Sequence, residues 1–153
     1  MTRTKIKIYD NAELRDELDA LYGTSNQVIL AHWALLLAKH ILDFAGIDYS
    51  TNDVILDGFN ISQEWQNGQA KVHDVRQSGF RIHQLAKQAE DIVQRTVYRV
   101  VGQSVAVGHM AEHAMVASDY AVKIVNLLFP DDGVAVTAER QWQINKLKQL
   151  LAN

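Results

Sequence analysis

The sequence contains no cysteine and only one proline, Pro130. The absence of cysteine excludes a disulfide framework, a thiol nucleophile and a zinc–thiolate site. It also fits a reducing compartment, so we expect the protein in the cytoplasm. With so little proline, the chain can form helix almost throughout, because proline is the residue that most strongly disrupts a helix interior.

The sequence also lacks a recognisable targeting signal. Residues 1–8 are basic but have no apolar centre of the kind that a signal peptide needs, and polar residues interrupt every apolar run, which argues against a membrane span. The formal net charge of −3 is too small to indicate a nucleic-acid or membrane partner. A length of 153 residues, 48% of them hydrophobic, is typical of one domain with a sizeable core.

Hydrophobic periodicity predicts an all-α fold, a single-domain bundle of about five to seven helices. We expect an N-terminal extension at residues 1–9 and one helical domain at residues 10–153, with only a weak strand pattern at residues 5–9. The pattern stays helical from residue 91 to residue 129, which is too long for one straight helix in a domain of this size. A kink or break is therefore expected between Gly102 and Gly108. The predicted helices cover residues 10–21, 25–45, 53–66, 71–87, 91–129 and 137–151.

Capping residues set the predicted boundaries. Asp10 with Glu13 forms a plausible capping box for the first helix, and Ser25 and Thr137 are candidate caps for the second and the last. Glycine favours the residue just past a helix end, which places expected helix ends at Gly23, Gly46, Gly68 and Gly133.

The charges are distributed unevenly along the chain. Between Lys39 and Lys71 the only basic side chain is that of His40. A solvated helix–loop–helix with its aromatic residues in the core would produce this composition, and so would a surface that contacts a basic protein, since tyrosine and tryptophan are favoured at interface centres. We call this interval the acidic segment, and its charged and aromatic residues are Asp43, Asp48, Asp53, Asp57 and Glu64, with Phe44, Tyr49, Phe59 and Trp65.

A stretch of mostly small and apolar residues, 101–115, carries His109 and His113 four positions apart. On one helix these two side chains would share a face near the packed side. Arg76 and His83 fall on the apolar face of the predicted helix at 71–87, so the pattern predicts an inward polar cluster of these four residues. Buried polar groups need hydrogen bonds, so the cluster either satisfies itself within the fold or binds a ligand, an ion or a partner. Fold specificity is the role that we assign to it.

Two polar stripes at helical spacing are interpreted as the solvent edges of otherwise buried helices. They consist of His32, Lys39 and Asp43 in one helix and Glu112, Asp119 and Lys123 in another.

The two histidines also admit a metal-binding interpretation. The segment 109–113 matches the H-x-x-E-H pattern of inverted zinc proteases, but those enzymes have much larger folds and a third acidic ligand well downstream. The spacing of His109 and His113 also resembles that of the DinB-like four-helix bundles, which add a histidine from an early helix, here His40 or His32. That resemblance implies a hydrolase or transferase with a divalent metal such as zinc or nickel. Neither a nucleophile elbow nor a phosphate-binding glycine loop is found.

Most of the chain resembles one further family. Six pieces match in order over about residues 28–143: Ala31–Ala34 with Ala38–His40, Glu64–Gly68, Lys71–His83, Gly102–Ala114, Asp119–Ala121 and Glu139–Gln143. Together they resemble the immunity-five-like family, small alanine-rich all-α immunity proteins of bacterial polymorphic toxin systems. This chain is less alanine-rich, with bulky residues at Val93, Val97, Tyr98 and Val100, a departure that affects packing more than the fold.

The resemblance implies a non-catalytic bacterial protein without a cofactor that binds and neutralises a toxin made by the same or a neighbouring strain. For the contact surface we single out Asp48, Tyr49, Asp53 and Asp57, because acidic groups could take the place of phosphates in the cleft of a nuclease toxin. A metal-dependent or small-ligand enzyme that uses His109 and His113 remains an alternative, as does an interaction bundle of another purpose. A homodimer that pairs through apolar helix faces is a further possibility.

Overall fold

A computed structural model describes all 153 residues, and it contains seven α-helices, one short 3₁₀ helix and no strand. The prediction of an all-α domain with five to seven helices is confirmed. Residues 1–11, which we call the N-terminal arm, are extended but pair with no strand. The helices are α1 Ala12–Thr24, α2 Gln27–Phe44, α3 Asp53–Gln66, α4 Val72–Gln88, α5 Ile92–Val105, η1 Ala106–Gly108, α6 His113–Leu128 and α7 Gly133–Leu151.

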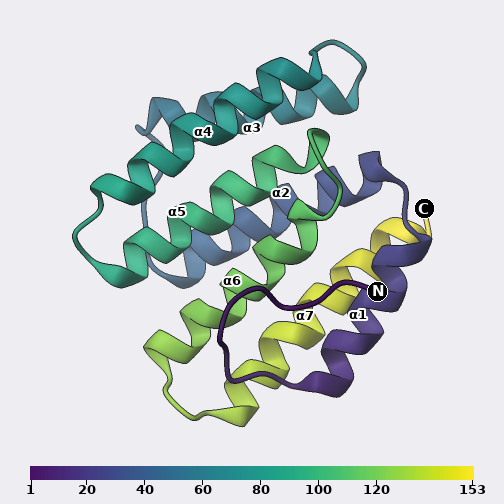
Figure 1. The fold of residues 1–153 in the computed structure, drawn as a ribbon, viewed down its shortest axis with the longest axis vertical. Coiled ribbons are helices and arrows are strands. Elements are labelled where there is room, and N and C mark those ends of the chain that lie inside the picture. The colour runs from purple at the N-terminus through teal and green to yellow at the C-terminus, as the bar shows by residue number, and fades with distance from the viewer.

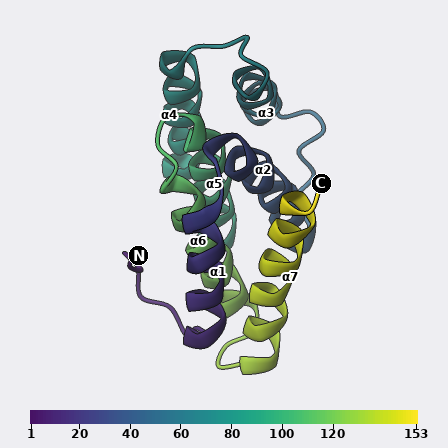
Figure 2. The same cartoon turned by 90° about the vertical axis from the view of Figure 1, so that its right-hand side faces the viewer.

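The helices stack in three tiers along the longest axis (Figure 1). The first tier holds α3 and α4, the middle tier α2 and α5, and the last tier α1, α6 and α7. Each tier contacts the next, because α4 packs on α5 and α5 packs on α6. Figure 2 shows the N-terminal arm on one side of the molecule and the connection between α2 and α3 on the other.

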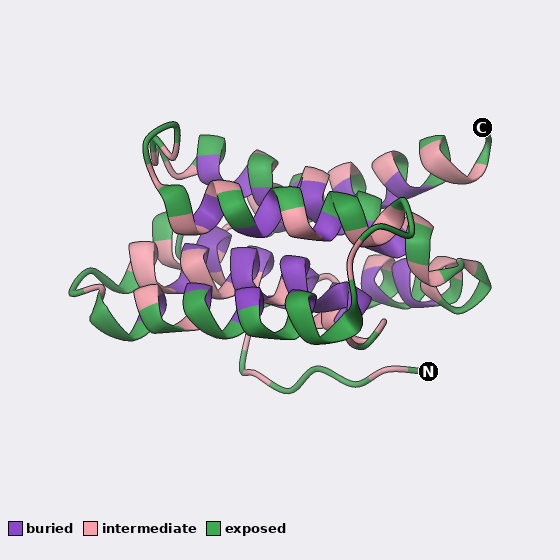
Figure 3. Cartoon of the chain, turned by 90° about the horizontal axis from the view of Figure 1, so that it is seen from above, coloured by how far each residue is buried: buried purple, intermediate pink, exposed green.

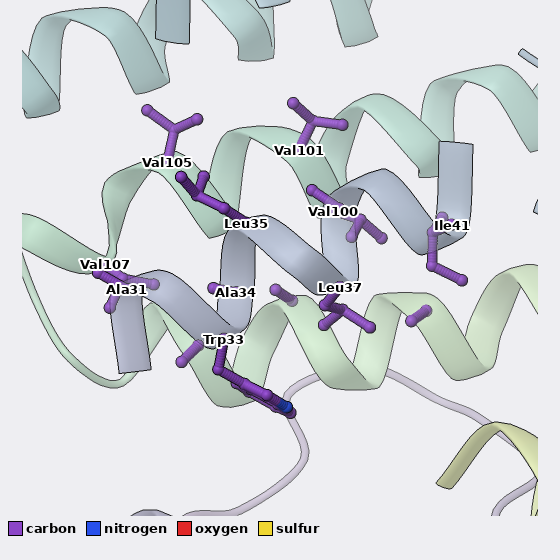
Figure 4. Packing of buried hydrophobic residues seen from close by; sticks show 14 of the residues in the cluster. Ala31, Trp33, Ala34, Leu35, Leu37, Ile41, Val100, Val101, Val105 and Val107 are labelled. Atoms are coloured by element: carbon purple, nitrogen blue, oxygen red, sulfur yellow. The ribbon is translucent and has the colours of Figure 1, made fainter. Parts of the chain in front are cut away.

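The core is built around α2, nine of whose residues are buried. Buried residues gather on the inner sides of the helices, whereas the N-terminal arm runs along the outside (Figure 3). Each buried leucine or isoleucine contributes roughly 1.5–3 kcal/mol to folding, so this central helix carries much of the hydrophobic stabilisation. Figure 4 shows part of the cluster, with Leu35, Leu37 and Ile41 of α2 and Val100, Val101 and Val105 of α5.

By length and composition α2 could also span a membrane, contrary to the expectation that no apolar run would qualify. Half of its 18 residues are buried inside the fold, and the core helix of a soluble protein passes the same test.

Three predicted caps are wrong, and in each case the side chain has another partner. Asp10 binds Arg140, so Asn11 caps α1 by accepting from the Leu14 N–H at 3.1 Å. The Ser25 hydroxyl donates to the Leu21 carbonyl, and the Thr137 hydroxyl accepts from the Asn11 side chain. The actual caps of α2 and α7 are Asn26 and Asp132.

Two of the four glycines end helices as expected. Gly46 and Gly68 have φ angles of 70° and 75°, the left-handed conformation that glycine adopts without a steric cost. At Gly46 the glycine N–H bonds the Asp43 carbonyl, and the next N–H bonds Leu42, which is the Schellman pattern. Gly23 instead lies inside α1, and Gly133 is the first residue of α7.

The long helical pattern breaks within the predicted interval. The α-helix ends at Val105, and η1 and a turn lead to α6, which begins at His113. Gly108 allows this bend to pack closely, because a Cβ there would lie 2.8 Å from the Trp65 ring. His109 and His113 therefore flank a turn and do not share one helix, so that part of the prediction is wrong.

Candidate functional site

The acidic segment forms an exposed surface over the end of α2, the connection to α3, and α3 itself. All five of its carboxylates are exposed, and none has a cationic partner within 4.0 Å. Arg81 of α4 lines the same hollow as Asp53 and Asp57 without reaching ion-pair distance. The Ser50 N–H bonds Asp48 at 2.9 Å, and this hydrogen bond lowers the pKa of Asp48. Tyr49 is half-buried, with its ring edge-on to Phe59 at 5.8 Å.

An apolar groove of about 340 Å³ lies next to the acidic segment, between α2, α6 and α7. Phe44 and Phe129 are 41% and 46% exposed at its edge, with ring centroids 6.1 Å apart. Large apolar side chains are rarely left in contact with water in a group, so such a patch is typical of a binding surface. We call it the aromatic groove, and its lining residues are His40, Phe44, Val125, Phe129, Ala135, Ala138, Glu139 and Trp142.

The groove has a polar floor and an acidic border. The His40 ring stacks on Trp142 at 3.8 Å, and its Nε2 lies 2.7 Å from the Glu139 carboxylate. Asp43 directly precedes Phe44, so the groove meets the acidic segment at the C-terminal end of α2. The exposed Asp131 and the half-buried Asp132 lie at the turn beside Phe129. The arrangement can receive an apolar side chain that is flanked by cationic ones.

Beneath this surface lies a polar network that the sequence analysis missed. Arg140 is completely buried and binds both oxygens of Asp10, at 2.9 and 2.7 Å, and Asp119 at 2.8 Å. Arg15 binds the same Asp119 with two hydrogen bonds of 2.9 and 3.0 Å. We call these four residues the arginine network. Burial lowers the pKa of Arg15, but the hydrogen bond and charge of Asp119 outweigh it, so the pKa is raised.

The network extends to the floor of the aromatic groove through Gln143. This side chain accepts from Arg140 at 3.0 Å and donates to Glu139 at 2.8 Å, and Glu139 in turn pairs with His40. The Gln143 carbonyl accepts from the indole N–H of Trp33 at 3.0 Å. The groove floor is therefore rigidly held.

The interpretation of Asp119 as part of a solvent edge is wrong, because it is only 3% exposed. A signal for the network was present in the sequence. Arg140 lies between the buried Val136 and Ile144, one turn away on either side, and so sits on the apolar face of its helix.

The predicted inward cluster forms only in part. Arg76 is exposed, with its guanidinium over the Phe80 ring at 5.4 Å, so its inward placement is wrong. The inner face of α4 is centred on the buried Val75 and Ile82, and Arg76 lies outside it.

His83, His109 and His113 are half-buried where α4, α5 and the turn before α6 meet, and we call this group the histidine corner. The rings of His109 and His113 stack at 5.7 Å, and Nδ1 of His113 lies 2.6 Å from the Gln103 side-chain oxygen. Nδ1 of His83 is buried without a hydrogen-bond partner in the chain. His83 packs against the backbone of Gly102, where a Cβ would lie 2.7 Å from the ring.

Burial lowers the pKa of both His83 and His113. The charges of Arg99 and Lys87 lower the pKa of His83 further, and those of the other two histidines and of Lys5 act in the same way on His113. The neutral forms of these two imidazoles are therefore favoured.

The predicted metal ligands are not assembled. His40 lies thirteen residues along α2 from Gln27, about 20 Å at 1.5 Å per residue, whereas Gln27 itself bonds the Val107 carbonyl near the histidine corner. His32, the other candidate, is exposed. Nowhere in the structure do three or more His, Cys, Asp or Glu side chains form a group that could hold a metal ion.

The family model described as Imm-5 like putative immunity protein matches residues 20–150 of the chain. The chain belongs to this family. No match is found among curated proteins or among solved structures. The resemblance seen in the sequence is thus confirmed, and the immunity-protein fold here is the seven-helix arrangement described above.

The six segments that resemble the immunity family in sequence contain many of the residues that form interior polar contacts in this chain. Asp119, Glu139, Arg140 and Gln143 all fall within them, as do the three residues of the histidine corner.

Proposed function

We propose that the protein binds and neutralises a cognate toxin of a bacterial polymorphic toxin system, as a non-catalytic inhibitor that acts in the cytoplasm. Membership of the immunity family is the observation that carries this proposal, because such a family implies a toxin partner. The contact surface that we assign is the acidic segment together with the aromatic groove.

The charges of the acidic segment support this assignment. Its carboxylates are exposed and unpaired, so their field extends into solvent and attracts a basic partner. Exposed charges of this kind raise association rates more than they raise affinity. A toxin with a cationic cleft, such as one that binds phosphates, fits this surface best.

The aromatic groove adds an apolar pocket to this charged surface. Binding energy in protein interfaces concentrates in a few aromatic or arginine anchors within well-packed pockets. Phe44, Phe129 and Trp142 provide such a pocket, and the hydrogen bonds under Glu139 keep its floor in place without a partner. A preorganised pocket loses little conformational entropy on binding.

A binding role also suits the interior. The arginine network and its extension bond mainly to one another, so these polar side chains are committed to holding the fold. Arg15, Asp119, Arg140 and Gln143 are buried and line neither of the hollows described above, whereas catalytic groups must face an open cleft.

The proposal is tested by expressing the full chain with the product of an adjacent toxin gene, with growth protection and the association and dissociation rates of the complex as the readouts. The double variant Asp53→Asn, Asp57→Asn should slow association at low salt about tenfold, and Phe44→Ala should weaken binding by roughly 2 kcal/mol through faster dissociation. Asp16→Asn, an exposed acid on α1, is the matched control and should change neither quantity. If both variants bound the toxin like the wild type, the assigned contact surface would be wrong. If the wild-type chain did not protect growth against the toxin, the proposed function would be wrong.

A further inference from the structure

A third hollow, of about 330 Å³, lies between the N-terminal arm, α5 and α6. Four cationic residues line it, together with Thr96 and Tyr120, and no acidic residue does. This is unexpected in a chain with 18 acidic and 15 basic residues. We call it the basic groove, and its cations are Lys7, Arg95, Arg99 and Lys123.

Each of these cations is held in place by its helix or by the arm. Arg95 donates from Nε and Nη2 to the Ala89 carbonyl at 3.3 and 3.0 Å, which leaves Nη1 free. Arg99 lies one turn further along the same face of α5. Lys123 lies on α6, three residues after Tyr120.

The arm fixes Lys7. The backbone N–H and carbonyl of Tyr9 form two hydrogen bonds with the Asn126 side chain, at 2.8 and 2.9 Å. On the other side of Lys7, Lys5 pairs with Glu112 at 3.2 Å. The segment between these two anchors therefore keeps Lys7 against the edge of α6.

None of the four cations has a carboxylate within 4.0 Å, although three of them are half-buried. Arg15 and Arg140, in contrast, each bind a carboxylate. Half-buried like charges repel one another more strongly than exposed ones, because less water screens them. An anion bound between the N-terminal arm, α5 and α6 would offset the positive charge of these four side chains.

We propose that the basic groove binds the phosphate group of a small molecule, either an inorganic phosphate or pyrophosphate or a nucleotide. Arginine presents a planar fork that bonds two phosphate oxygens at once, and lysine adds point charges from other directions. The unpartnered hydroxyl of Tyr120 can donate a further bond to the anion. A volume of about 330 Å³ equals that of about ten liquid waters, enough room for a diphosphate.

This site is separate from the proposed toxin surface. The arm and the α2–α3 connection lie on opposite sides of the molecule (Figure 2), so phosphate binding does not depend on the acidic segment.

The test is a titration of the full chain with pyrophosphate and, separately, with adenosine diphosphate, followed by amide chemical shifts at constant ionic strength. We expect saturable shifts at residues 6–7, 92–99 and 120–123, with a Kd of about 1 mM or tighter. Tighter binding of the nucleotide would identify it as the source of the phosphate, and equal binding would identify the free anion.

Two variants and one control decide the result. Arg99→Gln and Lys123→Gln should each weaken binding about tenfold, because each removes a charged hydrogen bond to the anion. Arg76→Gln removes the same charge from an exposed residue outside the groove and should leave the Kd unchanged. Shifts that do not saturate, or equal affinity in all three variants, would overturn the proposal.

Discussion

The arginine network and the histidine corner place polar groups in the interior in opposite ways. In the network, every charge meets an opposite charge with short hydrogen bonds, and Arg140 is completely buried. In the corner, three imidazole rings are half-buried, His83 has a nitrogen without a partner, and cationic side chains lie near His83. The network is fully satisfied, and the corner is not.

This difference indicates where the fold tolerates change. A buried ion pair is not in itself strongly stabilising, but the loss of one partner leaves an uncompensated charge at high cost. A half-exposed neutral ring loses much less, since water replaces part of its bonding. We therefore expect substitutions in the network to act on the whole fold and substitutions in the corner to act locally.

The largest effect is expected for Arg140→Met. It deprives Asp10 of its cationic partner and removes one of the two partners of Asp119, so the free energy of unfolding should fall by about 3–5 kcal/mol. Chemical denaturation of the full chain measures this change. Lys148→Met breaks the exposed pair with Glu17 and serves as the control, with an expected loss below about 1 kcal/mol. A similar loss of unfolding free energy in both variants would show that the arginine network is no more sensitive to substitution than an exposed ion pair.

A smaller effect is expected for Gly102→Ala in the corner. The new methyl group would collide with the His83 ring, which should destabilise the fold by about 1–2 kcal/mol. In a His83→Ala background the collision is absent, and the better helix propensity of alanine should then stabilise the fold by up to about 1 kcal/mol. A double-mutant cycle measures this change of sign. Additive effects would show that His83 does not pack on Gly102.

The smallest effect is the dependence of stability on pH. Because burial holds the pKa of His83 and His113 below the ordinary value of 6.5, the unfolded chain binds more protons as the pH falls below that value. Stability should therefore decline below pH 6.5, with a slope of at most about 1.4 kcal/mol per pH unit for each proton.

The double variant His83→Gln, His113→Gln should flatten this decline, whereas His73→Gln, at an exposed position, should not. Asp19, whose pKa is lowered below 3.8 because hydrogen bonds from Thr2 outweigh its burial, acts only at more acidic pH and does not interfere. If the double variant kept the same slope of stability against pH, groups other than His83 and His113 would account for the proton uptake.

The fold was largely predictable from the sequence because periodicity, the single proline and the glycine-terminated helices all act locally. Gly46 and Gly68 end helices by a conformation that depends only on their own backbone. Asp10, Ser25 and Thr137 were misjudged because each has a suitable side chain but forms a different contact, and for Asp10 and Thr137 that contact is to a residue far along the chain.

The candidate site was less predictable. The acidic segment could be identified from its composition, but the aromatic groove joins residues from α2, α6 and α7 and so depends on packing. Arg76 was misplaced because a rotation of one helix by less than a quarter turn decides whether a residue at the border faces inward.

The N-terminal arm has a consequence for where the folding unit begins. The family match starts at residue 20, and α1 starts at Ala12, yet Asp10 supplies a carboxylate to the most buried cation of the chain. A fragment cut at the family boundary would keep Arg140 but lose Asp10 and Arg15 together. The smallest piece of this chain that can reproduce the intact bundle therefore includes a segment that has no regular secondary structure of its own.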